Sequence, residues 1–363
     1  MSIERVAKYA GVSAATVSRV LNSVPVVSAS TVQAVKAAMV ALNYDPVELR
    51  RGPRPRNKRV PVNKINGNRP PASTGTIALV TVGHNPNKVR ALRLPVVNAV
   101  VEAITQAAKQ NGLQVLLDDM PSLADISDII RKKQVDGALV LLADLAPLDV
   151  LAEISQHVPV VWAMGGQAGP LLLDHVCENN IAIGHLAHQY LTGRGCGEVA
   201  FLTAEADRRF SQQRRQALAG AASEMGQRSF ALLVSDNPLV NDLFGSNVIA
   251  RASLVDLVEA FVAMSPRPDG LFIDRDATTA QVYPLLLKHG IQPGRDVIIV
   301  SCDNEEVRLS ALYPRPASID LGTTEIGVRA VRRLLLRIEN PDEPPIFIQA
   351  MPRLQPGDDE PRV

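Results

Sequence analysis

Short apolar segments alternate with longer helical patterns from Thr76 onward, and this alternation limits the possible folds more than any other feature. Strands are predicted in TIALVTVG, LQVLLDD, DGALVLLA, PVVWAMGG, EVAFLTA, FALLVSD, GLFIDRD and DVIIVSCDN. Helices are predicted between them, for example in PVVNAVVEAITQAAKQNG and DISDIIRKKQ, and at the end in IGVRAVRRLLLRIENP. Such a pattern predicts parallel sheets with helices on both faces, in two halves of similar size.

Length and composition predict a globular chain of two or three domains, because 363 residues with 46% hydrophobic content can bury a large core. The chain has no run of about 18 apolar residues, and its first residues, MSIERVAKYA, are charged where a signal peptide would be apolar. We therefore expect a cytoplasmic protein without a membrane partner. Cys177, Cys196 and Cys302 match no metal or redox spacing, so we expect them to be reduced and predict neither a metal nor a cofactor.

Charge is distributed unevenly along the chain. Residues 1–70 contain twelve Lys or Arg against three Asp or Glu, whereas residues 71–363 contain 26 against 34. A basic module on an acidic body favours a polyanionic partner, nucleic acid first and a membrane surface second. A solvated basic tail without a partner is the alternative that composition leaves open.

The first 21 residues carry the pattern of a helix-turn-helix. In IERVAKYAGVSAATVSRVLN, apolar residues line one face of each of two short helices. Between the helices, Gly11 can adopt the positive φ of a tight turn, Val12 can fill the turn, and Ser13 can cap the second helix. A third helix is predicted to begin after Ser28 or Ser30 and to run through VQAVKAAMVALNY.

These residues are similar to a known DNA-binding headpiece. VAKYAGVSAATVSRVLN, followed by VSAST and ALNYDP, closely resembles the headpiece of the LacI/GalR family of bacterial transcription regulators. The resemblance implies that the helix from Ala14 to Leu21 lies in the major groove of DNA. Polar side chains there would position the protein on phosphates, and Arg19 would read a guanine. The predicted DNA-binding residues of the headpiece are Ser13, Ala14, Ala15, Thr16, Ser18, Arg19, Asn22 and Ser28. For Ala14 and Ala15, the choice between a methyl contact with a base and simple helix propensity stays open.

Residues 50–71, RRGPRPRNKRVPVNKINGNRPP, replace the short hinge helix that this family normally has at that place. Pro53 and Pro55 fix φ and remove hydrogen-bond donors, so we expect the chain from Arg50 to Pro61 to be extended. Arginines spaced along an extended chain suit a narrow minor groove, and Arg51, Arg54 and Arg56 are predicted to bind DNA there. Non-specific attraction to phosphates and a passive tether are the alternatives.

The rest of the chain also resembles this family. Residues 76–354 are similar to its periplasmic-binding-protein-like effector domain, which has two doubly wound lobes with a ligand cleft between them. The similar segments are VDGALVL, HLAHQYLTGRGCGEVAFLT, HGIQPGRDVIIVSCDN and GVRAVRRLL. The expected fold class is α plus α/β. The predicted divisions are a headpiece at 1–49, a linker at 50–74, an effector-binding and dimerisation domain at 75–354 and a tail at 355–363.

Several positions match effector-binding residues of the family. Arg214, Asp276 and Asp303 match its arginine and two acids, and Arg275 stands where an Asn is usual. His84, Asn85 and Trp162 are predicted to contribute from the first lobe. Arg and Asp can bind hydroxyl or carboxylate groups through charge-assisted hydrogen bonds. The alternatives are salt bridges between the lobes for the charged residues and core packing for Trp162.

Together these observations predict a homodimeric regulator, acting as a repressor, that binds a pseudo-palindromic operator under control of a small molecule. The effector is expected to be a sugar, a sugar phosphate or a sugar acid. Arg275 favours an anionic effector, because it places a cation where the family usually has a neutral amide. We predict no catalytic residues, because GRGCGE follows a helix instead of a strand and no nucleophile or metalloprotease motif occurs. A solute-binding protein without a DNA role and a regulator that has lost effector control are the alternatives.

Overall fold

A computed structural model describes residues 3–21, 27–42, 74–82, 94–120, 126–142, 148–165, 173–235 and 247–358. The chain divides into two compact units, Met1–Lys64 and Ile65–Val363. Mixed helix and sheet confirm the predicted fold class. Among the described residues, no helix has the length and apolar character needed to cross a membrane.

The first unit contains the three predicted helices. They are α1 (Ile3–Tyr9), α2 (Ala14–Leu21) and α3 (Ala29–Ala41). Gly11 has φ +65°, which confirms the positive φ predicted for the turn between α1 and α2. Val6, Val17 and Val35, one from each helix, are fully buried against one another in a small core. Val12 and Val20 pack against the same core, as expected.

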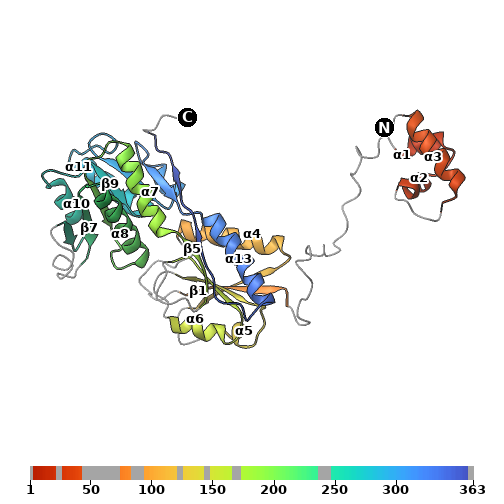
Figure 1. Ribbon diagram of the computed structural model, residues 1–363, viewed down its shortest axis with the longest axis horizontal. Coiled ribbons are helices and arrows are strands. Elements are labelled where there is room, and N and C mark those ends of the chain that lie inside the picture. Colours follow the sequence, from red (N-terminus) through yellow and green to blue (C-terminus); the bar gives the residue numbers. More distant parts are fainter. Residues whose placement is uncertain are drawn as a thin grey trace. The chain divides into compact units, whose positions relative to one another are not determined.

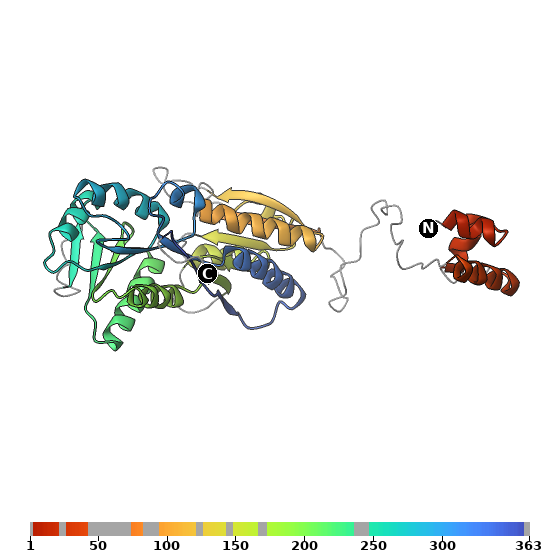
Figure 2. The ribbon, with the colours of Figure 1, turned by 90° about the horizontal axis from the view of Figure 1, so that it is seen from above.

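The second unit holds two sheets in separate halves, each covered by helices (Figures 1 and 2). The first sheet has the strand order β12-β5-β4-β3-β1-β2, and its described pairs are parallel. Its strands are β1 (Thr76–Val82), β2 (Gln114–Met120), β3 (Ala138–Leu142), β4 (Val160–Ala163), β5 (Asp174–Glu178) and β12 (Phe347–Ala350). Its helices are α4 (Pro95–Gln110), α5 (Asp128–Arg131), α6 (Leu148–Ser155) and α13 (Thr323–Glu339).

The second sheet has the order β13-β11-β10-β9-β6-β7-β8, and only the described pair β11–β13 is antiparallel. Its strands are β6 (Val199–Thr203), β7 (Ser229–Val234), β8 (Val248–Arg251), β9 (Gly270–Ile273), β10 (Ile298–Cys302), β11 (Ala317–Asp320) and β13 (Arg353–Gln355). Its helices are α7 (Asn180–Gly193), α8 (Arg209–Glu224), α10 (Leu254–Val262), α11 (Asp276–Lys288) and α12 (Glu306–Leu309). We call the halves with the first and second sheets the N-lobe and the C-lobe.

Alternate side chains of each central strand point to opposite faces of the sheet, so both faces are apolar. Ile77 and Leu79 of β1 belong to the core that includes α4 and α13. Ala78 and Val80 belong to the core with α5 and α6. The C-lobe repeats this arrangement, with α7 and α8 on one face of the sheet and α10 and α11 on the other. The predicted alternation of strand and helix is therefore confirmed.

The chain passes between the lobes after β5, after β11 and after β12. These crossings lie together, because the Asn179 amide donates to Ala350 O over 3.1 Å and a Cβ on Gly322 would stand 3.2 Å from Ala350 Cβ. Helix α13 returns from the C-lobe and packs closely on α4, where a Cβ on Gly327 would lie 2.6 Å from Ala103 Cβ. Three neighbouring crossings define a hinge between the lobes.

A buried ion pair fixes α13 to the first sheet. Asp174 of β5 is 1% exposed, and its carboxylate lies 2.8 Å from Arg337 Nε and 2.9 Å from Arg333 Nε. The Ile346 amide donates to the same carboxylate over 2.8 Å. These bonds join residues about 160 positions apart, so the local sequence could not have revealed them.

Candidate DNA-binding surface and effector site

The N-terminus of α2 is capped by a residue that we predicted to bind phosphate. Ser13 Oγ accepts from the Thr16 amide at 3.1 Å and lies 2.9 Å from the Thr16 hydroxyl. Ser28 caps α3 in the same way, through the Thr31 amide at 3.4 Å and the Thr31 hydroxyl at 2.8 Å. A hydroxyl has two lone pairs and a proton, so a capping serine keeps capacity for a phosphate contact. Their DNA contacts stay predictions.

Arg19 is exposed in the last turn of α2, and Val17 of the same helix is fully buried. This arrangement leaves the guanidinium free to meet a base edge while the apolar face holds α2 in place. Ala14 is half-buried and packs against the core, which supports a structural role for it. Tyr9, which the sequence reasoning did not single out, has 64% of its surface exposed at the end of α1. The side chains of Ala15 and Ser18, and the residues Asn22, Arg51, Arg54 and Arg56, lie outside what the structure describes.

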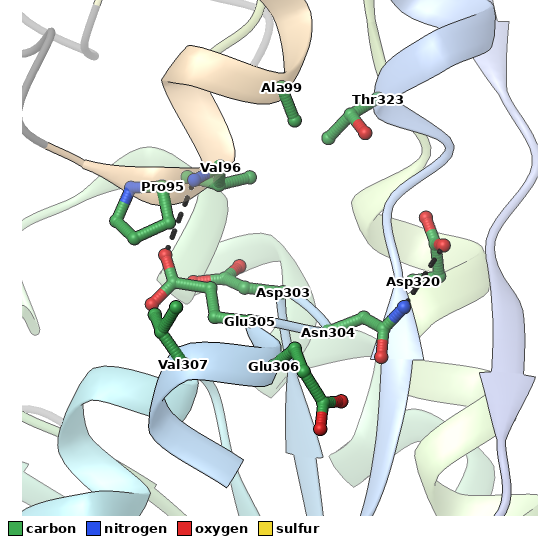
Figure 3. A pocket seen from close by; sticks show the side chains of 10 residues that line it. All are labelled: Pro95, Val96, Ala99, Asp303, Asn304, Glu305, Glu306, Val307, Asp320 and Thr323. Atoms are coloured by element: carbon green, nitrogen blue, oxygen red, sulfur yellow. Dashed lines mark hydrogen bonds between the residues drawn. The ribbon is translucent and has the colours of Figure 1, made fainter. Parts of the chain in front are cut away.

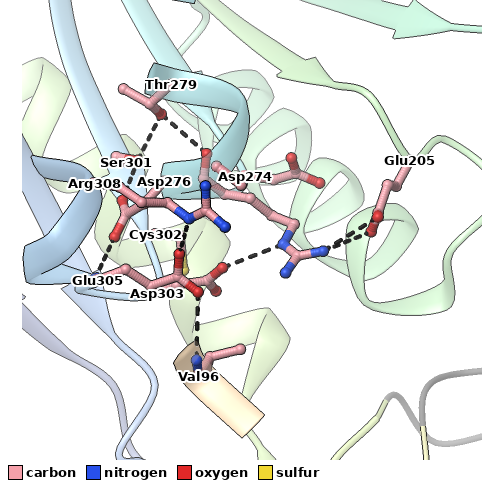
Figure 4. Close-up of polar contacts among 12 residues, drawn as sticks. Val96, Glu205, Asp274, Asp276, Thr279, Ser301, Cys302, Asp303, Glu305 and Arg308 are labelled. Carbon is pink, nitrogen blue, oxygen red and sulfur yellow. Dashed lines mark hydrogen bonds and ion pairs between the residues drawn. The ribbon is translucent and has the colours of Figure 1, made fainter. Parts of the chain in front are cut away.

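In the C-lobe, three charged side chains meet at the carboxyl ends of neighbouring strands. Glu205 follows β6, Arg275 follows β9 and Asp303 follows β10, and these strands are adjacent in the sheet. Arg275 Nη1 lies 3.1 Å from Glu205 Oε2, and Arg275 Nε lies 3.2 Å from Asp303 Oδ2 (Figure 4). We call these three residues the strand-end triad. Carboxyl ends of parallel strands are where doubly wound sheets bind ligands.

The strand-end triad is largely shielded from water. The side chains of Arg275 and Asp303 are 13% and 4% exposed, while Glu205 keeps 34%. Burial raises the pKa of the Asp303 carboxyl to about 7, against the lowering effect of Arg275 and Arg214. Asp303 and its neighbour Asn304 also have positive φ, at 108° and 54°. Positive φ at residues other than glycine is strained and collects at ligand sites.

Asp276 links the loop after β9, which carries Arg275, to the loop after β10, which carries Asp303, and it is fully buried. Its carboxylate accepts hydrogen bonds from the hydroxyls of Ser301 and Ser318, the latter at 2.9 Å, and from the Glu305 amide at 2.6 Å. Burial raises its pKa to about 6 although these bonds favour the charged form. The observed partners of Asp276 are parts of the protein, so a direct contact with effector stays a prediction.

Arg214 is buried at the hinge side of the C-lobe, with 2% of its surface exposed. Its Nε donates to Asn180 Oδ1 at 2.9 Å and its Nη1 donates to Asp274 O at 2.7 Å. Asn180 begins α7 directly after a lobe crossing, and Asp274 precedes Arg275 of the strand-end triad. Arg214 therefore joins the hinge to the loop after β9, which carries Arg275, and the sequence alone did not indicate this connection.

Trp162 lies in the N-lobe core. Its ring stacks on the His175 ring, with centroids 3.9 Å apart and an angle of 5° between the planes. The His175 ring in turn lies 5.2 Å, centroid to centroid, from the Phe347 ring. Strand register explains the stack, since Trp162 pairs with His175 and His175 with Phe347. Burial lowers the pKa of His175 to about 4. With 8% exposure, Trp162 fits the packing alternative better than stacking on a ligand. His84 and Asn85, which follow β1, lie outside the described residues.

A cavity of about 200 Å³ lies between the N-terminus of α4 and the loop after β10 (Figure 3). It therefore has walls from both lobes. Its lining residues are Pro95, Val96, Ala99, Asp303, Asn304, Glu305, Glu306, Val307, Asp320 and Thr323. Asp303 thus contacts Arg275 and also lines a cavity that the N-lobe helps to form. Four other lining groups are carboxylates or an amide, which makes this region acidic and rich in hydrogen-bond acceptors.

Comparison with known families matches both units. Residues 2–47 match the bacterial regulatory proteins of the lacI family, and residues 188–358 match the periplasmic binding protein-like domain. The chain belongs to the lacI family. It is thus a DNA-binding transcriptional regulator with a ligand-binding domain, and its relatives are repressors, not enzymes.

Relatives of this lacI family member align over nearly the whole chain. The transcriptional repressor PurR of Mannheimia succiniciproducens is 25% identical over 360 residues, which cover 97% of this chain and 96% of PurR. A solved complex of the transcriptional regulator CelR with cellobiose is 25% identical, with a TM-score of 0.64 and coverage of 99% and 100%. A lac repressor dimer bound to operator, 19% identical with a TM-score of 0.61 and coverage of 99% and 98%, shows the shared fold.

Proposed function

We propose that this chain is a homodimeric repressor, acting in the cytoplasm, whose operator affinity is controlled by a neutral polyhydroxylated molecule, a sugar or a close derivative. In this proposal residues 1–49 read DNA, 50–74 join the parts and 75–354 bind ligand and dimerise. Two headpieces would contact the two half-sites of a pseudo-palindrome. The similarity to a cellobiose-binding regulator and to PurR repressors supports this reading.

The strand-end triad is the observation that carries the ligand proposal. Carboxylates and a guanidinium, held at the ends of β6, β9 and β10, can make charge-assisted hydrogen bonds to sugar hydroxyls. Asp303 is fixed by its bond to Arg275 and by the turn after β10, so it is already oriented. Preorganised polar groups lose little freedom when a ligand binds.

Charge favours a neutral ligand over an anionic one. Arg275 first suggested an anion, because it stands where this family usually has Asn. The structure pairs that guanidinium with both Glu205 and Asp303, so one cation is shared by two carboxylates. A phosphate or carboxylate ligand would have to displace one of them. The acidic residues of the neighbouring cavity add further repulsion.

A thermal-shift screen of the full chain tests this proposal. The panel would contain neutral sugars such as cellobiose, sugar phosphates such as glucose 6-phosphate, and sugar acids such as gluconate. A ligand at about 100 times its Kd stabilises the folded state by about 2.7 kcal/mol, which is readily measured. We expect a rise in Tm with a neutral sugar and no rise for Asp303→Asn. A rise with only the anionic members would overturn the neutral assignment, and no rise at all would favour a regulator without effector control.

A further inference from the structure

Glu305 reaches from the C-lobe to the N-lobe. It lies two residues after Asp303, is 4% exposed, and its Oε1 accepts from the Val96 amide at 3.4 Å (Figure 4). Val96 is in the first turn of α4, whose N-cap residue Leu94 provides no side-chain hydrogen bond. A helix N-terminus attracts negative charge because its first amides have no partner within the helix. Glu305 therefore caps a helix of the opposite lobe.

The position of Glu305 depends on the effector site. Its backbone amide donates to Asp276 Oδ2 at 2.6 Å, and its Oε2 forms an ion pair with Arg308. Asp303, in the same turn, is bound to Arg275. Because this turn is short and tied at both ends, a shift of Asp303 or Arg275 also moves the carboxylate that caps α4.

The capped helix belongs to the rigid part of the N-lobe. Helix α4 packs against α13 without space for a side chain at Gly327. Its residues Val97, Val100 and Ile104 share one core with Ile77 and Leu79 of β1. Thr74 lies just before β1, and its amide donates to the Asp136 carboxylate over 2.6 Å. This bond fixes the point where the linker enters the N-lobe. A displacement of α4 therefore reaches the end of the linker through packed elements.

We propose that Glu305 is a positioning residue that couples the strand-end triad to the N-lobe, through its cap on α4. This inference deepens the proposed function and rests on it, since the triad matters to regulation only if it binds an effector. The capping hydrogen bond joins two parts of the protein. Its acceptor, Glu305, belongs to the turn that carries Asp303, and its donor, the Val96 amide, belongs to the lobe that is joined to the linker. The neighbouring cavity gives the turn room to move.

Hydrogen exchange on the full chain, without ligand, tests the cap. We expect the first turn of α4 to exchange about three- to tenfold faster in Glu305→Gln, because the neutral amide is a weaker cap. Glu325→Gln is the matched control, since Glu325 is exposed on α13 and pairs with Arg329 one turn away on the same helix. Unchanged exchange in Glu305→Gln would overturn the proposal.

A double-mutant cycle tests the coupling. Asp303→Asn loosens the turn, so it should speed exchange in the first turn of α4 when Glu305 is present. The same substitution should change that exchange by less than twofold in the Glu305→Gln background. Equal effects of Asp303→Asn in both backgrounds would refute coupling through Glu305. Neither measurement contains a sugar, so failure of the ligand proposal would be seen separately, in the thermal-shift screen.

Discussion

Removing Arg275 should destabilise the second compact unit, which contains both lobes, more at high pH than at low pH. In Arg275→Gln, Asp303 loses its ion pair at 3.2 Å while its side chain is only 4% exposed. The pKa of Asp303 is about 7 with Arg275 present, because burial raises it and Arg275 lowers it. Without Arg275, the pKa must rise above that value.

The sign follows from proton linkage. A carboxyl whose pKa is higher in the folded protein than in the unfolded chain binds more protons when folded, so its contribution to stability falls as pH rises. In the wild type this fall ends near pH 7, whereas in Arg275→Gln it continues above pH 7. The two proteins therefore diverge by about 1.4 kcal/mol per pH unit above pH 7. We expect Arg275→Gln to lose about 1.4 kcal/mol more at pH 8 than at pH 6.

Urea unfolding followed by the fluorescence of Trp162 measures this difference. Trp162 is the only Trp of the chain and is buried in the second compact unit, so the headpiece does not contribute to the signal. Arg295→Gln is the matched control, because Arg295 is 65% exposed and pairs at the surface with Asp296. Its effect should stay within about 0.5 kcal/mol at either pH. Equal losses for Arg275→Gln at pH 6 and pH 8 would refute a buried Asp303 that titrates against Arg275.

Three further predictions concern the anchor of α13, the recognition helix and the linker. Asp174→Asn should cost about 3–5 kcal/mol in urea unfolding, because it leaves Arg333 and Arg337 without their buried carboxylate; a loss below 1 kcal/mol would contradict that role. Arg19→Ala should weaken discrimination at one base pair of each half-site by about 1–3 kcal/mol in a binding-site selection, without loss of folding; unchanged preference would exclude Arg19 as a base reader. Glutamine substitution in the linker should flatten the dependence of operator affinity on salt by roughly one unit per lost phosphate contact; an unaltered slope would leave the linker as a tether. The substituted residues are Arg50, Arg51, Arg54, Arg56, Lys58 and Arg59.

Local patterns predicted much of the fold. The bounds of α2, the cap at Ser13 and the positive φ of Gly11 follow from the chemistry of single residues and their neighbours. The eight predicted apolar strands were also found, and those in the middle of each sheet are buried on both faces, whereas β8, β11, β12 and β13 were not predicted. Strand β5 was missed since DHVCE contains two acids and a histidine. Its Asp174 is tolerated in the core only because Arg333 and Arg337 arrive from the distant α13.

The sequence singled out two of the three residues of the strand-end triad, Arg275 and Asp303, but not how they are arranged. Asp303 and Arg275 were selected by family resemblance, and the structure brings them together at 3.2 Å. Their partner Glu205, 70 residues before Arg275, was missed, although its place just after a strand was a usable signal. Glu305 was missed for a different reason: a helix cap supplied by another lobe leaves no trace in the sequence around either residue. The role of Trp162 depended on strand register, which sequence did not determine.

The most direct test of ligand control at the strand-end triad is the operator affinity of the full chain, measured with and without the sugar that gives the largest thermal shift. Coupling free energies between such sites are about 1–3 kcal/mol, so the wild-type Kd should change by about 5- to 150-fold. Asp303→Asn should show no change in operator affinity when the sugar is added. A sugar response that persists in Asp303→Asn, or a wild-type affinity that the sugar leaves unchanged, would contradict control through this site.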